Sequence, residues 1–492
     1  MSRTAVIVEF PRPDTAAAET LRDALRQVGY SESAVHGLLG EDASGGTEQS
    51  APADERRLPH TRLATVIRLL LLQRAVPRRA AVEALGWRGV GALETMGLAE
   101  VGDEVLPRVR MLPVGPLLIT GDGYAQGDDP SDYVAIYTPT SRVCDSLTPR
   151  PRVERALDVG TGSGIHALLA AGHADHVVAT DVNPRALAFT ELNAVLNGVT
   201  NVECRQGSLF EPVTGETFDL ITCNAPYVVS PENRWAYRDS GLEADEFSAQ
   251  VVRAAAAHLA DGGYATLVVS WLAPDEDAPD ERAFEWTDST GCDSWILPVW
   301  DADPVSHASL WNSHLDGQAF GLALDQWAAY FERLGVRWIS EGAVLLHKRP
   351  GGGDARVDSI DEDDLEDAGE QILQAFAARE RLSSLERDGD LLEERLSLGV
   401  VLSLEQELEP EDGGAAIAKA RIQLCEGTNS VVDVEPGVLD VVASLGGRLP
   451  LGEVVDTVAD RIDLSATERA RLERDAVETA RELLELGALV VA

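Results

Sequence analysis

The sequence predicts an α/β fold in which a doubly wound domain with a seven-stranded sheet is flanked by two mainly helical regions. Between residues 111 and 349, short apolar strands alternate with amphipathic helices, whereas helical spacing dominates before and after this stretch. At 492 residues the chain is too long for one ordinary core. We therefore divide it into four regions: 1–110, 111–349, an acidic linker at 350–370, and 371–492.

The composition is that of a soluble globular protein, and a cytoplasmic location is expected. Hydrophobic residues make up 45% of the chain and charged residues 25%. No apolar run approaches the roughly 18 residues of a membrane span. The five cysteines form no C-x-x-C pair and have no histidine at ligand spacing, so neither a disulfide framework nor a metal site is expected. The net charge of -42 is consistent either with solubility alone, the commoner case, or with a body that repels phosphate backbones and favours basic protein partners.

Region 1–110 is expected to be mainly helical and winged-helix-like. Apolar residues recur at helical spacing in 16–29, 60–75 and 77–85, and a short two-stranded wing is expected before residue 114. From 56 to 88 there are eight arginines and one acid, Glu83. Such a run is typical either of a nucleic-acid face or, more commonly, of a solvated helix surface.

The central region supplies the sheet. Strands are predicted at 155–160, 176–182, 201–207, 218–225, 264–271, 294–300 and 343–349. Helices are predicted between them at 165–172, 184–198, 244–261 and 323–335. The order indicates a parallel sheet covered on both faces.

The two following regions differ in apolar content. Residues 351–370 are rich in glycine and then in acids, as expected of a linker. Beyond it, the helical pattern returns, and 437–492 contains three helical segments and a β-like end at 488–492. This order predicts a second winged-helix-like domain, whose acidic helices favour protein partners.

A glycine-rich turn follows the first predicted strand. The stretch Asp158–Gly164 reads DVGTGSG, and a helix is expected to begin at once. Glycines allow a ligand to approach the main chain, and the helix start offers unpaired N–H groups. Asp181, at the end of the next strand, can accept hydrogen bonds from both hydroxyls of a ribose. The G-x-G-x-G spacing departs from the G-x-G-x-x-G of dinucleotide sites and favours S-adenosylmethionine.

The fourth predicted strand ends in Asn224, Ala225, Pro226 and Tyr227. The side-chain oxygen of Asn224 and the carbonyl of Ala225 could accept both hydrogens of a planar NH2 group. Pro226 would fix the backbone and Tyr227 could stack on the plane. This arrangement predicts methylation of a nitrogen, and no general base is needed because a methylated amide nitrogen loses its proton easily.

Together, the motifs DVGTGSG, ATDVN, GSLFEP and CNAPY resemble the class I S-adenosylmethionine-dependent methyltransferases, specifically the HemK/PrmC-like group with its N-P-P-Y signature. The lead-in AIYTPTSRVCDSL at 135–147 is similar to that of archaeal and eukaryotic members. The resemblance covers about 120–275 and implies a Rossmann-like methyltransferase domain.

The resemblance implies a role for each matching position. Residues Asp158, Gly160, Thr161, Gly162, Ser163 and Gly164 would line the methionine part of S-adenosylmethionine. Asp181 would hold the ribose, and Ser208 and Leu209 would lie beside the adenine. Asn224 would contact both cofactor and substrate, and Ala225, Pro226 and Tyr227 would complete the substrate site. Ala225 replaces the first proline of the motif, and Ser208 stands where an aspartate is usual.

Three functions remain open from the sequence. The first is methylation of a protein glutamine, with a translation factor as the family's typical substrate. The second is methylation of an exocyclic amine of an RNA base, which the arginines of 56–88 would support. The third is an inactive interaction scaffold, for which Ala225 and Ser208 are the arguments. His166 is interpreted as a residue of the helix after the glycine turn.

Overall fold

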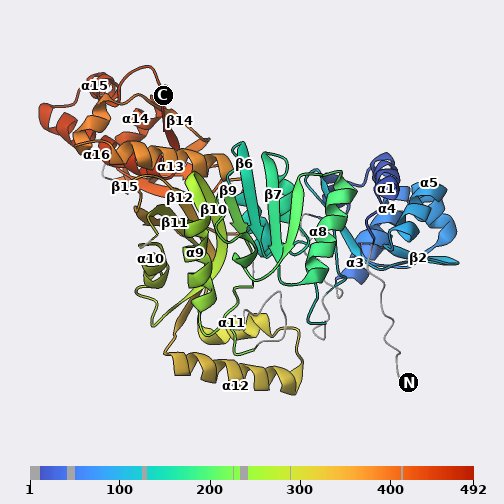
Figure 1. The fold of residues 1–492 in the computed structure, drawn as a ribbon. Helices are drawn as coiled ribbons and strands as arrows, with labels where there is room; N and C mark the ends of the chain where they lie inside the picture. Colours follow the sequence, from blue (N-terminus) through green and yellow to red (C-terminus); the bar gives the residue numbers. More distant parts are fainter. Residues whose placement is uncertain are drawn as a thin grey trace. The chain divides into compact units, whose positions relative to one another are not determined.

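The computed structural model describes residues 12–40, 50–124, 130–224, 226–232, 242–288, 290–411 and 414–492 (Figure 1). The chain divides into two compact units. The first unit comprises 1–144 and 151–357, and the second comprises 145–150 and 358–492.

The first unit begins with helices and small antiparallel sheets. Its helices are α1 (Thr15–Val28), α2 (Glu32–Leu39), α3 (Ala51–Arg57), α4 (Arg62–Val66), a π-helical turn η2 (Ile67–Leu71) and α5 (Arg78–Thr95). β1 (Val76–Pro77), β3 (Glu104–Pro107) and β2 (Ala99–Val101) form one sheet, and β4 (Arg110–Val114) and β5 (Leu117–Gly121) form a hairpin. The winged-helix description of this region stays a prediction.

A mixed sheet forms the centre of the first unit and confirms the predicted α/β class. Its strand order is β13-β11-β12-β10-β9-β6-β7-β8. The bounds are β6 (Val153–Val159), β7 (Ala174–Asp181), β8 (Val202–Gln206), β9 (Phe218–Cys223), β10 (Leu259–Ala273), β11 (Cys292–Ala302), β12 (Trp338–Lys348) and β13 (Ala355–Val357). β12 runs antiparallel to both of its neighbours, and the other pairs are parallel.

The predicted count of seven strands is not confirmed, because within the described residues the sheet has eight. The extra strand, β13, lies in the predicted linker and pairs with β11. It has only three residues, a run too short for the alternation of apolar and polar side chains to give a strand signal. Asp293 fixes its start by accepting hydrogen bonds from the N–H groups of Gly353 (3.0 Å) and Asp354 (3.1 Å).

Helices connect the strands. They are α6 (Pro139–Ser146), α7 (Ile165–Ala170), α8 (Pro184–Asn197), η3 (Glu211–Val213), α9 (Glu246–His258), α10 (Glu281–Asp288), α11 (Pro304–Trp311) and α12 (Gly317–Leu334). From β6 the chain passes through β7 to β8 on one side, and then returns to β9 on the other side of β6. This reversal is the kind of switch point at which open α/β sheets bind ligands.

Helix α8 joins the N-terminal region to the sheet. Leu21 and Leu25 of α1 share one buried apolar cluster with Phe189 and Leu192 of α8. Polar contacts reinforce this packing, because the fully buried Asn193 side chain satisfies both the N–H and the C=O of Thr120 on β5, each at 2.9 Å. The N-terminal region therefore shares its core with the sheet domain.

The second unit combines helices with short sheets. Its helices are α13 (Gly369–Ser383), η4 (Asp388–Glu393), α14 (Val438–Ala443), α15 (Leu451–Arg461) and α16 (Ala466–Glu485). β14 (Leu396–Leu398) pairs with β18 (Leu489–Val491), and β15 (Leu402–Glu411), β16 (Gly414–Leu424) and β17 (Val431–Val434) form a three-stranded antiparallel sheet. The sequence did not predict β15–β17, because glutamate, which is depleted in strands, fills alternate positions of β15.

We expect Asn193→Ala to lower the free energy of unfolding by about 2 to 4 kcal/mol, because it leaves several buried polar groups of β5 and the glycine turn without partners. Urea denaturation followed by tryptophan fluorescence measures this change. Asn201→Ala is the control, since the half-buried Asn201 amide donates to two carbonyls only, those of Ala171 and Ala174. Equal losses in the two variants would contradict the role given to Asn193.

Candidate active site

The register of three parallel strands brings the predicted site residues into one row. Val159, the last residue of β6, pairs with Thr180 on β7 and with Cys223 on β9. The next residues along the chain are therefore Gly160, Asp181 and Asn224, side by side on strands spaced about 4.8 Å apart. Sequence segments up to 64 residues apart thus meet at the carboxyl edge of the sheet, beside the switch point.

The glycine turn needs its glycines. Gly160, Gly162 and Gly164 have φ values of 68°, 55° and 84°, in the left-handed region that side chains disfavour. A Cβ at Gly164 would lie 2.8 Å from Thr190 Cγ2, so this glycine lets α8 approach the turn. A Cβ at Gly162 would meet nothing within 4 Å. The turn is therefore packed against α8 at Gly164 and has open space beside Gly162.

Asp158 lies buried beneath the turn. One carboxylate oxygen accepts hydrogen bonds from Thr161 Oγ1 (2.7 Å) and the Ala167 N–H (3.1 Å), and the other accepts from Thr222 Oγ1 (2.9 Å). Burial raises the pKa of Asp158 to about 6, although these three bonds oppose the shift. The carboxylate thus ties β6 to β9 and to the start of α7.

Asp181 is held at the edge of the sheet with its carboxylate fixed. Oδ2 accepts from the Gly162 N–H at 3.0 Å, and Oδ1 accepts from the Asn183 N–H at 2.8 Å. Burial raises the pKa of Asp181 despite these bonds. Each oxygen retains a lone pair, so the group can accept two further hydrogen bonds from a diol.

The loop after β8 reaches the same edge. The Gly207 N–H donates to the Asp181 carbonyl at 3.0 Å, and Thr180 Oγ1 donates to the Leu209 carbonyl at 3.2 Å. Ser208 is exposed, and Leu209 is half-buried with φ 48°. The structure therefore brings the loop that carries both predicted adenine-binding residues next to Asp181.

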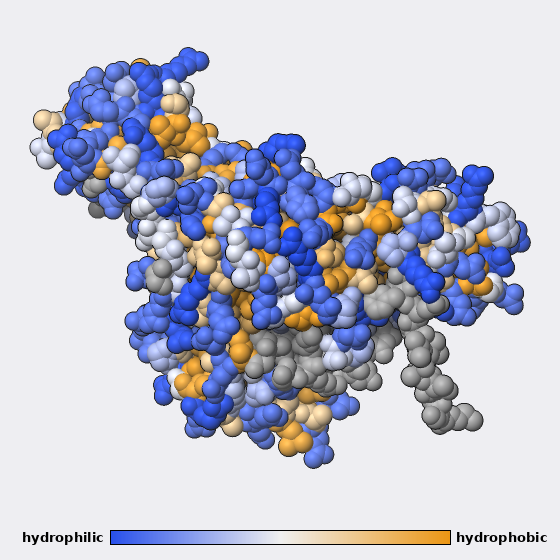
Figure 2. Space-filling view, viewed as in Figure 1, coloured by the Kyte–Doolittle hydropathy of each residue, from blue (hydrophilic) through white to orange (hydrophobic). Residues whose placement is uncertain are grey.

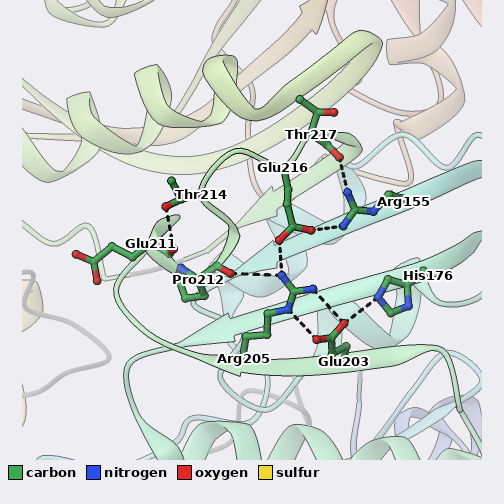
Figure 3. Close-up of polar contacts among 9 residues, drawn as sticks. All are labelled: Arg155, His176, Glu203, Arg205, Glu211, Pro212, Thr214, Glu216 and Thr217. Carbon is green, nitrogen blue, oxygen red and sulfur yellow. Dashed lines mark hydrogen bonds and ion pairs between the residues drawn. The ribbon is translucent and has the colours of Figure 1, made fainter.

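A network of ion pairs supports the base of this loop (Figure 3). Glu216 bridges Arg155 on β6 and Arg205 on β8, and Arg205 also donates to the Pro212 carbonyl at 3.3 Å. Glu203 joins the network through Arg205 and His176. Two arginines beside Glu216 lower the pKa of its carboxyl. Single exposed ion pairs contribute little, but several charges sharing partners can order a loop.

Asn224 follows β9, and its amide has a defined orientation. Its Nδ2 donates to Ser141 Oγ at 3.2 Å, and Ser141 is buried on α6. Ser141 Oγ also lies 2.9 Å from Thr138 Oγ1, which can accept its proton. Because the nitrogen end of the amide is occupied, Oδ1 is the end that can accept a hydrogen bond from another molecule.

The other residues of the predicted substrate motif are Ala225, Pro226 and Tyr227. Ala225 lies outside the described residues. Pro226 is half-buried, while the Tyr227 side chain is only 6% exposed and belongs to the apolar core. The Tyr227 carbonyl accepts a hydrogen bond from Ser270 Oγ at 2.6 Å. Stacking of Tyr227 on a substrate stays a prediction.

The lead-in segment crosses the glycine turn. Ser163 Oγ donates to the Ile136 carbonyl at 2.8 Å, and the Ser163 carbonyl accepts from Asn193 Nδ2 at 2.8 Å. Ser141 belongs to the lead-in, but neither Ser141 nor Asn193 was predicted as a site residue. Only their partners reveal their importance, because serine and asparagine are common in helices that face solvent.

The described part of the chain has neither a group of metal-ligating side chains nor a helix suited to crossing a membrane. There, no three or more His, Cys, Asp or Glu side chains are grouped so that they could hold a metal ion. No described helix is long and apolar enough to cross a membrane.

Comparison with known proteins identifies the central domain. The family described as "Methyltransferase small domain" matches residues 140–279. A release factor glutamine methyltransferase from Geobacter sulfurreducens is 35% identical over 133 residues, which are 24% of this chain and 46% of the relative. Residues 140–279 form a HemK/PrmC-like small methyltransferase domain. A second family, described as a domain of unknown function (DUF7059), matches residues 27–111.

Two further relatives match part of the chain. Ribosomal protein uL3 glutamine methyltransferases from Bordetella pertussis and Bradyrhizobium diazoefficiens are 44% and 31% identical over 80 and 173 residues. These matches cover 16% and 32% of this chain, and 27% and 54% of the relatives. The chain thus spans about half, or less, of the length of the curated relatives it matches.

We expect cofactor binding to weaken as the pH falls, because Asp181 accepts hydrogen bonds from hydroxyls best when ionised and its pKa lies above the usual 3.8. Isothermal titration with S-adenosylmethionine between about pH 8 and about pH 5 measures the effect. The loss of cofactor binding should begin at a higher pH than it would if Asp181 had the usual pKa of an aspartate. Asp181→Asn should bind weakly with a flatter pH profile, and an unchanged slope in this variant would assign the titration to another group, such as Asp158.

Proposed function

We propose that the protein is an S-adenosylmethionine-dependent N-methyltransferase that acts on a glutamine side chain of a protein. The observation that carries the proposal is Asn224, held next to the glycine turn by strand register and oriented by Ser141. Transfer of a methyl group to an NH2 nitrogen requires a hydrogen-bond acceptor that holds this nitrogen close to the cofactor. Asn224 and the glycine turn, which follow adjacent strands, fit this requirement.

The residues present fit the cofactor. Open space beside Gly162, the fixed carboxylate of Asp181 and the neighbouring loop at Ser208 suit a small molecule with a diol and a planar base. When bound, S-adenosylmethionine supplies a methyl group attached to a positively charged sulfur. Asp158–Gly164 would hold its methionine part and Asp181 its ribose.

Asn224 would prepare the acceptor nitrogen. Its Oδ1 accepts one hydrogen of a planar NH2 group, which orients the nitrogen and helps localise its lone pair. After the nitrogen gains the methyl group, it loses one proton to water. Positioning and exclusion of water are the contributions of the protein, so no dedicated base is required.

The hydrogen bonds and ion pairs of the arginines at 56–88 favour a protein substrate over RNA. Arg62 and Arg68 donate to main-chain carbonyls, at 2.7 Å to Ala84 and 2.9 Å to Leu58. Arg57 and Arg74 pair with Asp54 and Glu55. These four side chains bind other residues of the same region. The arginine run therefore supports a packing role more than a nucleic-acid face. The names of the relatives likewise mention release factors and a ribosomal protein as substrates.

Transfer of labelled methyl from S-adenosylmethionine into fractionated cell extract tests the proposal. We expect label in protein, recovered after enzymatic digestion as methylated glutamine, and we expect Asn224→Ala to lower the rate at least about 100-fold while cofactor binding persists. Asp181→Ala should abolish binding itself. Label in RNA would support the base-methylating alternative, and absence of both binding and transfer would support the scaffold.

Ser141→Ala tests the orientation of the amide. We expect a fall of about tenfold in kcat, because the Asn224 amide can then rotate, with little change in the KM for the cofactor. Ser141→Thr retains the hydroxyl and should restore most of the activity. Thr287→Ala is the control, since Thr287 is a buried residue of α10 whose hydroxyl donates to the Phe284 carbonyl. Equal kcat values for wild type and Ser141→Ala would contradict the orienting role.

A further inference from the structure

A helical insertion separates two strands that need only a tight turn. β11 ends at Ala302 and its antiparallel neighbour β12 begins at Trp338. Antiparallel neighbours can be joined by two residues, whereas here residues 303–337 intervene and form α11 and α12 (Figure 1). Pairing of β11 with β12 does not require so long a connection, which indicates that the insertion has another role.

Strand polarity places the insertion at the edge that carries the candidate site. β11 runs antiparallel to β12, which runs antiparallel to β10, which is parallel to β9. β11 therefore runs in the same direction as β9. Its carboxyl end, from which the insertion starts, lies at the same edge of the sheet as Asn224.

Two hydrogen bonds tie the insertion to the segment that follows Asn224. The His307 Nε2–H on α11 donates to the Val229 carbonyl at 3.2 Å, and Trp327 Nε1 on α12 donates to Glu232 Oε1 at 3.2 Å. The His307 and Trp327 side chains are 3% and 0% exposed, and their rings contact each other. The insertion is thus fixed to the chain within eight residues of Asn224.

A buried carboxylate strengthens this anchor. Glu341 of β12 lies 3.2 Å from His307 Nδ1 and accepts from Trp311 Nε1 at 3.1 Å. The middle and the carboxyl end of α11 are therefore held to the sheet. Loss of the anchor would release the insertion and the segment at 229–232 together.

The insertion exposes large apolar side chains that have acids near them in the sequence. Val305, Leu310 and Leu322 are 54%, 67% and 62% exposed, and Figure 2 shows apolar side chains at the surface where Figure 1 places α12. Exposed acids accompany them: Asp303 precedes Val305 by two residues, and Asp325 follows Leu322 by three. Apolar side chains with acids nearby suit a basic protein surface and repel phosphates.

We propose that α11 and α12 form the docking surface for the protein whose side chain is methylated, an inference that rests on the proposed function. The partner is a basic protein with an apolar patch beside its acceptor side chain. Hydrogen bonds to Val229 and Glu232 join the insertion to the segment that follows Asn224, so a protein docked on the insertion would have its acceptor side chain close to Asn224.

Steady-state methylation of the basic protein fraction of a cell extract tests this inference with the full chain. We expect the double variant Leu310→Ser, Leu322→Ser to raise the apparent KM for the fraction at least about tenfold, with kcat within about twofold. The Kd for S-adenosylmethionine and the Tm should not change, because both side chains are exposed. Higher salt should raise the apparent KM of the wild type. Leu106→Ser, on β3 and 42% exposed in the wild type, is the matched control.

The outcomes separate this inference from the function on which it rests. If the wild type labels protein and the double variant has an unchanged KM, the docking surface is overturned and the methyltransferase proposal stands. If the wild type binds the cofactor but labels only RNA, or nothing, both proposals are overturned. A raised KM that Leu106→Ser reproduces would also overturn the docking surface, since the effect would not be specific to the insertion.

Discussion

The parallel register of β6 with β7 and β9 is the constraint on which the site depends. Pairing of Val159 with both Thr180 and Cys223 fixes which residues come next at the edge, and these are Gly160, Asp181 and Asn224. A slip of one residue would turn each side chain to the other face of the sheet. The buried Asp158 opposes such a slip, because its carboxylate binds Thr222 on β9 and Thr161 in the turn simultaneously.

Helix α8 extends this constraint to the N-terminal region. Thr190 closes over Gly164, and one turn later the Asn193 amide satisfies both β5 and the Ser163 carbonyl. Any shift of the β4–β5 hairpin against α8 would therefore disturb the glycine turn through a single buried side chain. This coupling explains why the region before residue 111 belongs to the same compact unit as the sheet.

The sequence predicted the elements of the sheet because their signals are local. Seven apolar strands, the glycine turn and Asp181 follow from spacing alone, and all lie where expected. β13 was missed because three residues are too few to show a periodicity. The strands β15–β17 were missed because β15 is rich in glutamate, a residue that is uncommon in strands, although its backbone pairs with β16. Ser141 and Asn193 were missed for a different reason: their roles depend on partners that lie 83 and 73 residues away in the chain.

Ala225 replaces the first proline of the motif, and hydrogen bonds hold Asn224 before it and Tyr227 after it. A proline there would restrict the main chain, and alanine removes that restriction. Two hydrogen bonds hold described residues on either side of this position. Asn224 is held through its side chain by Ser141, and Tyr227 is held through its carbonyl by Ser270. The described neighbours of position 225 are thus held by the buried hydroxyls of Ser141 on α6 and Ser270 on β10, in a motif that retains Pro226.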